Sequence, residues 1–243
     1  MNKLIRTEAK LTLREPVGMA FSLLLPLGLV LAFGLAADVT EPDPNLGGQI
    51  PLDTVLPSLA LALSFAMVAI FMLPGFMADY RARGILRRLS TTPVHPAKLL
   101  AAQTAVQFTI ALISVPLVLG LAVALGMNLP EQLLTVIGVL LLGGLALFAV
   151  GTLISAVAPD PKIGYVYSAL VFFPSLFFAG MYLPKEQMPD WLSTLGDFTP
   201  LGAFRESLEN AFTGTAQDPL MLLTLAATAI LAGTIATRVF RWE

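Results

Sequence analysis

The sequence predicts an all-α membrane protein with six transmembrane helices, and three observations lead to this fold class. Hydrophobic residues make up 56% of the 243 residues and charged residues only 12%. The mean hydropathy is +0.81, which does not suit a water-exposed surface. Six long apolar runs contain no charged residue, and the cations lie between these runs, mostly on one predicted side of the membrane.

Each apolar run is long enough to cross a bilayer. The shortest has 19 residues, and at about 1.5 Å per residue a helix of that length spans a hydrocarbon core of roughly 30 Å. The first run follows basic residues, as a secretory signal does. It exceeds the roughly 7 to 15 apolar residues of a signal and five more runs follow it, so we expect it to be retained. The runs are 17–37, 54–78, 99–125, 132–158, 163–183 and 219–237.

The loops carry their cations unevenly. Twelve of the fourteen Lys and Arg residues fall in the N-terminal segment, the 79–98 and 158–162 loops and the C-terminal tail. Only Lys185 and Arg205 fall on the other side. The positive-inside rule therefore predicts that both termini are cytoplasmic, which agrees with an even number of crossings.

Residues 1–15 carry a helical pattern of their own. Four cations fall on one stripe at about 100° per residue, with apolar residues on much of the opposite side. This predicts an amphipathic helix in the cytoplasmic interface, with its cations near anionic headgroups. A disordered basic tail is the alternative, and Glu8 on the apolar side counts against the helix. The cations are Lys3, Arg6, Lys10 and Arg14.

The largest predicted external element is 184–218, which contains two short helical patterns. Pro189 can open the first and Gly196 can end it. In the second, Thr199 can cap the helix, Pro200 suits its first position and Gly214 lies just past its end.

The second of these helices is amphipathic by its spacing. Apolar residues recur at i, i+3, i+7 and i+10, and the polar residues are predicted to face away from them. We expect this helix to dip into the outer leaflet or to cover the bundle. The apolar positions are Leu201, Phe204, Leu208 and Ala211, and the polar ones are Arg205, Glu206, Glu209 and Asn210.

Several kinds of chemistry have no residues to support them. The six runs lack Asp, Glu, Lys, Arg and His, which disfavours proton-coupled transport and charged channel filters. The chain has no cysteine and one histidine, His95, which lies in a loop and is not expected to be catalytic or to bind metal. No GxxxxGK[ST] phosphate loop is present, so energy for transport has to come from a cytoplasmic partner.

The 79–98 loop is the candidate docking place for such a partner. Interpreted as a helix from Tyr80 to Ser90, it places apolar and basic residues on different faces, as insertion into a groove with an acidic rim requires. A basic interfacial loop that only fixes topology is the alternative, and periodicity alone leaves both open. The candidate docking residues are Arg83, Gly84, Ile85, Leu86, Arg87, Arg88 and Leu89.

Two segments resemble the type-2 ABC exporter permeases. "ADYRARGILRRLSTTPVHPAKLLAAQ", residues 78–103, is similar to the segment after the second helix of that family, where a charged run precedes Gly-Thr-Leu, a basic pair and Thr-Pro. "FFAGMYLPKEQMPDWLSTLGDFTPLGAFRESL", residues 177–208, is similar to the family signature near the fifth helix. Two positions depart from the pattern, because Arg83 replaces a frequent acid and Ile85 the usual Thr.

The resemblance implies a single permease domain over 1–243 with a defined division of roles. Residues 1–15 correspond to the connecting helix, 79–92 contain the coupling helix that contacts the ATP-binding subunit, and 184–214 form short external re-entrant helices. Two permease copies form the pathway, and two cytoplasmic ATPase subunits bind ATP and magnesium, so this chain itself needs no cofactor and is not an enzyme. The expected location is the inner or plasma membrane of a prokaryote.

The substrate is predicted from the apolar character of the spans. An amphipathic drug, antibiotic or lipid-like molecule fits them better than a sugar or an ion, although a polysaccharide or glycolipid permease of the same fold and a non-transporting scaffold stay open. The candidate pathway residues are Ser64, Met67, Phe71, Phe172, Phe173 and Phe177. The candidate external gate residues are Pro184, Trp191, Pro200 and Phe204.

Overall fold

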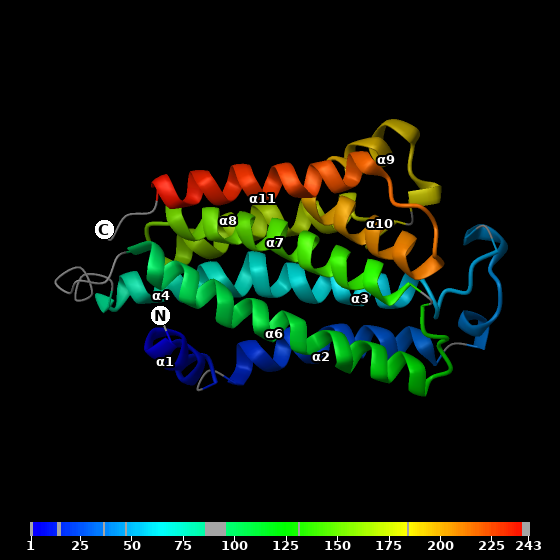
Figure 1. Ribbon diagram of the computed structural model, residues 1–243, viewed down its shortest axis with the longest axis horizontal. Helices are drawn as coiled ribbons and strands as arrows, with labels where there is room; N and C mark the ends of the chain where they lie inside the picture. Colours follow the sequence, from blue (N-terminus) through cyan, green and yellow to red (C-terminus); the bar gives the residue numbers. More distant parts are fainter. Residues whose placement is uncertain are drawn as a thin grey trace.

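The computed structural model describes residues 2–13, 16–35, 37–46, 48–85, 96–130, 132–183 and 185–239, and these form an elongated bundle of helices (Figure 1). Most of the helices run along the long axis. Their bounds are α1 Asn2–Thr12, α2 Pro16–Gly34, α3 Val55–Ala66, α4 Leu73–Ala82, α6 Pro96–Ala124, α7 Leu133–Val157, α8 Pro161–Phe178, α9 Asp190–Asp197, α10 Pro200–Thr213 and α11 Pro219–Val239. Short 3₁₀ turns, η1 Ala37–Thr40, η2 Pro44–Leu46 and η4 Lys185–Gln187, lie in the connections.

The helices match the predicted apolar runs closely. Within the described residues, five helices are long and apolar enough to cross a membrane, namely Val55–Ala82, Lys98–Ala124, Leu133–Val157, Pro161–Phe178 and Pro219–Val239. The first predicted span corresponds to α2, Pro16–Gly34, a helix of 19 residues that is apolar over Ala20–Gly34. The fifth span ends at Phe178 rather than at 183, because Gly180 (φ 78°) turns the chain after α8.

One span is a composite rod of three segments. α3 passes into the π-helix η3, Met67–Met72, and then into α4. Pro74 cannot donate a hydrogen bond to the preceding turn, and the chain widens just before it: the Leu73 N–H bonds to Val68 O, five residues back. We call this unit, Val55–Ala82, the α3–α4 rod.

The centre of the bundle is α7, and its glycines set how closely the other helices approach. A Cβ atom at Gly143 would overlap the ring of Phe204 from α10, and one at Gly151 would overlap the carbonyl oxygen of Ala69 in η3. α7 also packs along the length of α11. Close backbone approach at small residues is how helices gain contact area inside membranes.

Helix α10 forms as its local signals predict. The Thr199 side chain accepts a hydrogen bond from the Gly202 N–H at 3.1 Å, Pro200 occupies the first helical position, and Gly214 follows with φ 73°. Helix α9 is likewise confirmed, although Gly196, predicted to end it, lies one residue before its last residue, Asp197.

Helix α10 does not simply cover the bundle, and two of its polar residues are buried. The helix lies inside the bundle against α3, α7, α8 and α11 (Figure 1), and Phe204 is fully buried. Arg205 and Glu209, expected to face away, are only 4% and 8% exposed. They can be buried because they form an ion pair in which each charge neutralises the other.

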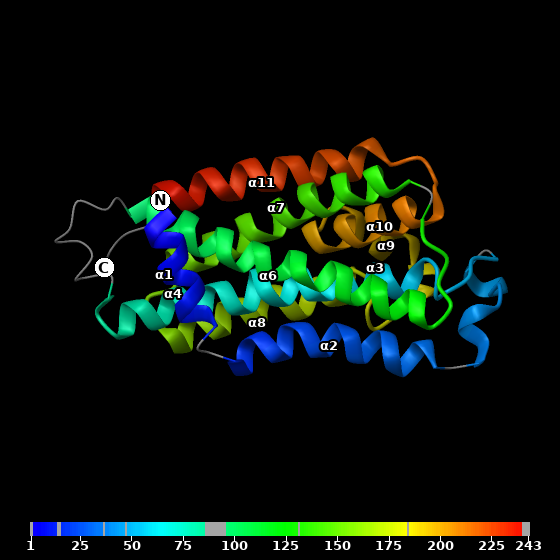
Figure 2. The ribbon, with the colours of Figure 1, turned by 60° about the horizontal axis from the view of Figure 1, so that its bottom comes forward.

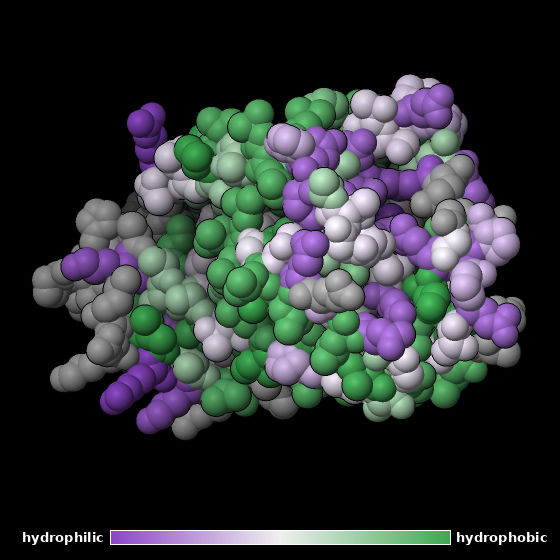
Figure 3. All heavy atoms as spheres, turned by 45° about the vertical axis from the view of Figure 1, so that its right-hand side comes forward, coloured by the Kyte–Doolittle hydropathy of each residue, from purple (hydrophilic) through white to green (hydrophobic). Residues whose placement is uncertain are grey.

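The two ends of the bundle hold different elements. α1, the end of α4 and the end of α11 lie together at one end, here named the α1 end, and α9 with the start of α11 lies at the other, the α9 end (Figures 1 and 2). Figure 3 shows an apolar band between hydrophilic side chains gathered toward the ends. This distribution is what a membrane-spanning bundle requires.

Replacing Gly143 with alanine is expected to lower the stability of the bundle. The added methyl group overlaps Phe204, and overpacking of this kind costs about 1–3 kcal/mol. Gly138→Ala on the same helix is the matched control, because no atom lies within 4 Å of its Cβ position. Thermal melting in detergent should show a loss for Gly143→Ala and none for Gly138→Ala; equal melting temperatures would contradict the packing described here.

Candidate functional site

The end of α4 is fastened to the end of α7 by Arg81. Its Nη1 donates to the carbonyl oxygen of Ser155 at 2.9 Å and to that of Ala158, and its Nη2 donates to Ala156 O at 3.3 Å. The last carbonyls of a helix have no partners within the helix and carry its negative dipole end. A guanidinium there forms several charge-assisted bonds at once, so the two helix ends are expected to move together.

Helix α1 is fastened to the same place by Glu8. Its carboxylate accepts a hydrogen bond from the Tyr80 hydroxyl at 2.6 Å, and Glu8 is only 3% exposed. Burial raises the pKa of the Glu8 carboxyl, and the Tyr80 hydrogen bond offsets part of that rise. Glu8 therefore belongs to the buried face of α1, whereas the apolar residues Leu11 and Leu13 are 40% and 64% exposed.

The predicted continuous helix from Tyr80 to Ser90 is wrong in its first part. α4 ends at Ala82, the Gly84 N–H bonds to Arg81 O, and Gly84 has φ 67°. This left-handed glycine breaks the helix, and Ile85 is helical again. The other candidate docking residues, Leu86, Arg87, Arg88 and Leu89, lie outside the described residues, as does His95.

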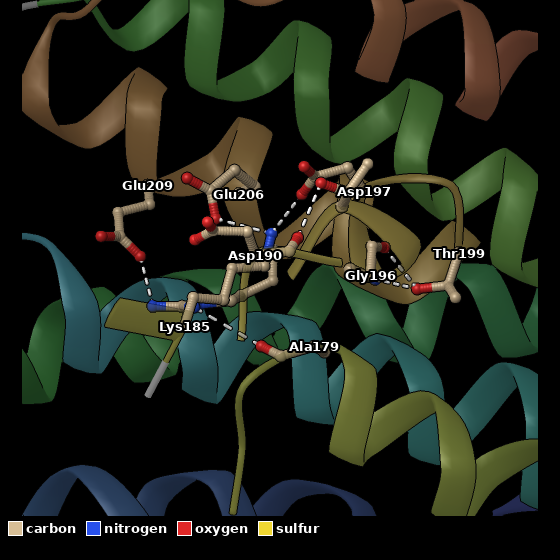
Figure 4. Close-up of polar contacts among 11 residues, drawn as sticks. Ala179, Lys185, Asp190, Gly196, Asp197, Thr199, Glu206 and Glu209 are labelled. Atoms are coloured by element: carbon tan, nitrogen blue, oxygen red, sulfur yellow. Dashed lines mark hydrogen bonds and ion pairs between the residues drawn. The ribbon is translucent and has the colours of Figure 1, made fainter. Parts of the chain in front are cut away.

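At the α9 end both cations of that side are paired with carboxylates, and Figure 4 shows the acidic residues around Lys185. Lys185 Nζ lies 2.5 Å from Asp197 Oδ1 and 3.0 Å from Glu206 Oε2, which joins η4, α9 and α10. Arg205 pairs with Glu209 one turn along α10, and its Nη1 donates to Ala179 O just beyond the end of α8 at 3.5 Å. These pairs fix α10 against α8 and α9.

The four candidate gate residues do not form one group. Phe204 is buried against Gly143, while Trp191 on α9 is 66% exposed. Pro200 starts α10 and is half-buried. Pro184 lies outside the described residues.

Most of the candidate pathway residues do come together. Phe71 packs against Phe172 with ring centroids 5.4 Å apart, and Phe172 packs against Phe173 at 5.6 Å. Met67 and Phe71 line a cavity of about 210 Å³ with Tyr165. Ser64 and Phe177 lie elsewhere, because Ser64 is buried and donates to Ser22 O at 3.5 Å, and the Phe177 ring packs on Phe178.

Sequence reasoning missed the residues that join the helices at the α1 end. Arg81 was counted only as a cation of the loop, and Glu8 only as an exception on an apolar face. That exception was the available signal, because a carboxylate at a buried position needs a partner and Tyr80 supplies it. Among the described residues no cluster of His, Cys, Asp and Glu could hold a metal ion.

A family model described as ABC-2 type transporter matches residues 2–213. The chain belongs to the ABC-2 type transporter family. With five described helices long and apolar enough to cross a bilayer, this ABC-2 permease is a multi-pass membrane protein. The match covers every described helix up to α10, including the α4 end and the α9–α10 pair.

Among curated proteins, this ABC-2 permease is similar to Nodulation protein J from Rhizobium leguminosarum bv. trifolii. The two are 36% identical over 80 residues, which cover 33% of this chain and 30% of the relative. The similarity therefore spans less than a third of the relative's length. No solved structure matches this ABC-2 permease.

Replacing Glu8 with glutamine is expected to flatten the pH dependence of stability. The pKa of Glu8 is raised in the folded state, so the neutral carboxyl stabilises the fold. This stabilisation is complete at a pH below the pKa of the unfolded chain, near 4.5, and it is lost as the pH rises through the pKa of the folded state. Glutamine stays neutral and still accepts from Tyr80.

Thermal melting in detergent at pH 5 and pH 8 tests this. The loss of melting temperature at pH 8 should be smaller in Glu8→Gln than in the wild type, and the exposed Glu41→Gln should follow the wild type. An unchanged pH dependence in Glu8→Gln would contradict the prediction, because it would show that ionisation of this carboxyl does not affect the stability of the fold.

Proposed function

We propose that this chain is the transmembrane permease of an ABC exporter, working as a homodimer with two cytoplasmic ATPase subunits. The observation that carries the proposal is Arg81: three carbonyl oxygens at the end of α7 bind the guanidinium that lies two residues before the candidate docking residues. A movement imposed on the 83–89 segment by a partner is thereby passed to the central helix of the bundle.

The proposed topology has six spans, with the α1 end in the cytoplasm. Most cations of the chain belong to segments that meet at this end, and α2 to α11 supply the crossings. α1 lies along the cytoplasmic interface, with Arg6 and Lys10 exposed and Glu8 and Thr12 buried. α9 and α10 form the external re-entrant pair.

The proposed route of movement runs through α7. Arg81 joins the α4 end to α7, and Gly143 of α7 receives the ring of Phe204 on α10. α10 in turn holds α8 and α9 through Arg205 and Lys185. ATP-driven closure of the ATPases would shift the docking segment, then α7, then the external pair, and open the pathway to the outside.

The proposed substrate is a hydrophobic or amphipathic molecule. The exposed surface of α8 is apolar, with Phe173 53% and Leu170 66% exposed, and the cavity beside Phe71 is small and aromatic. The small size of this cavity supports a drug-, antibiotic- or lipid-like substrate over a polysaccharide, for which we expect a wide pathway lined by exposed aromatics and without a lateral opening.

Co-purification with the ATPase subunit tests the docking role. Leu86→Asp and Arg87→Glu are expected to reduce ATPase association and export, because they remove an apolar anchor and reverse a charge in the docking segment. Lys162→Gln, in the first turn of α8, is the control and should behave as the wild type. If no ATPase associates with the wild type and both variants export normally, the chain is a scaffold rather than a transporter subunit.

A further inference from the structure

We propose that a trough between α2 and α8 binds an amphipathic organic cation, with the charge at Asp79 and the apolar part against aromatic and methionine side chains. This deepens the proposed function by naming the class of substrate, and it rests on that function for its role in export. The lining residues are Phe21, Met67, Phe71, Met72, Gly75, Phe76, Asp79 and Tyr165.

The trough follows from the packing of three elements. The α3–α4 rod lies between α2 and α8 (Figure 1) and contacts both of them. Phe21 of α2 forms one side, Tyr165 of α8 the other, and η3 with α4 the floor, which leaves a cavity of about 210 Å³. The floor is a π-helical segment followed by Pro74, an irregularity that often marks functional sites in helices.

The floor is shaped to admit a ring. Gly75 has no side chain, and a Cβ atom there would lie 2.9 Å from the Tyr165 hydroxyl oxygen. The absence of this atom lets Tyr165 reach the rod, where its ring lies 6.1 Å from that of Phe71. At this spacing the two rings contact each other and form one continuous aromatic wall, against which an apolar group of a ligand can pack.

The side chains of the trough favour cations. Aromatic faces attract cationic groups, and the thioethers of Met67 and Met72 adapt to ligands of different shape. Asp79 is the one charged residue that lines the trough in the described part of the chain. An anion of the same shape would meet the Asp79 carboxylate and the negative faces of the rings, so the trough is selective for charge.

Asp79 already holds a cation, but loosely. Its Oδ2 lies 3.5 Å from Arg83 Nη2, and the side chains are 35% and 65% exposed. Exposed pairs of this kind contribute little, so a ligand that also fills the aromatic trough can displace Arg83 from the carboxylate. Arg83 is the first candidate docking residue, and its release would report an occupied trough to the ATPase.

The binding test uses two probes of the same shape and opposite charge, tetraphenylphosphonium and tetraphenylborate, with the purified permease alone in nanodiscs. Equilibrium dialysis should show that the wild type prefers the cation. Asp79→Asn should weaken cation binding by roughly five-fold and leave binding of tetraphenylborate the same or stronger. Glu41→Gln, an exposed carboxyl outside the trough, is the control and should match the wild type.

A second variant is expected to change the affinity for the cation in the opposite direction. Arg83→Gln removes the competing cation and should tighten binding of tetraphenylphosphonium, so the proposal remains testable even if Asp79→Asn folds poorly. Equal binding of both probes by the wild type, or no response to either variant, overturns the proposal. Because no ATPase is present, failure here is separate from failure of ATPase co-purification, which tests the exporter role.

Discussion

The close approach of three elements to the glycines of α7 is the constraint on which the rest of the structure depends. Gly143 admits the Phe204 ring, Gly144 lies against Phe65 and Phe108, and Gly151 admits the Ala69 carbonyl. In a bilayer the hydrophobic effect does not drive helices together, so packing depends on how near their backbones can come. These contacts join α10, α6 and the α3–α4 rod to the central helix in one body. The cavity beside Phe71 lies on the far side of the same rod.

Charge is used at both ends of this apolar body in a similar way. At the α1 end Arg81 binds the last carbonyls of α7, and at the α9 end Arg205 reaches the Ala179 carbonyl just after α8. Each guanidinium thus joins the end of one helix to another helix. The carbonyls at a helix end have no partner within their own helix, so a charged donor both satisfies them and fixes the angle between the helices. The two ends are therefore joined to the core by directional bonds, while the middle is held by shape.

The sequence predicted the local features well and the tertiary ones poorly. Thr199, Pro200 and Gly214 set the bounds of α10 through local hydrogen bonds and backbone preferences, which a linear pattern contains. The burial of Arg205 and Glu209 could not be predicted, because helical spacing shows which residues share a face but not whether that face meets water or another helix. The break after α4 could have been predicted, because Gly84 is a glycine that follows a basic residue and a glycine readily takes a left-handed conformation. The hydrogen bonds of Arg81 could not, because their acceptors lie more than seventy positions away in the sequence. Met67, Phe71, Phe172 and Phe173 lie together on the rod and α8, whereas Ser64 faces α2; that these residues line a pathway stays a prediction.

The central claim is that movement of the docking segment reaches the external helices through Arg81 and α7. The chain contains no cysteine, so two introduced cysteines can be spin-labelled without background. Labels at Leu35, beyond the end of α2, and Thr194, on α9, report on the α9 end by double electron–electron resonance in the complex with its ATPase, with one labelled copy per dimer. The account predicts that ATP changes this distance in the wild type and that Arg81→Met abolishes the change while ATP hydrolysis continues. The same ATP-dependent change in Arg81→Met would contradict it.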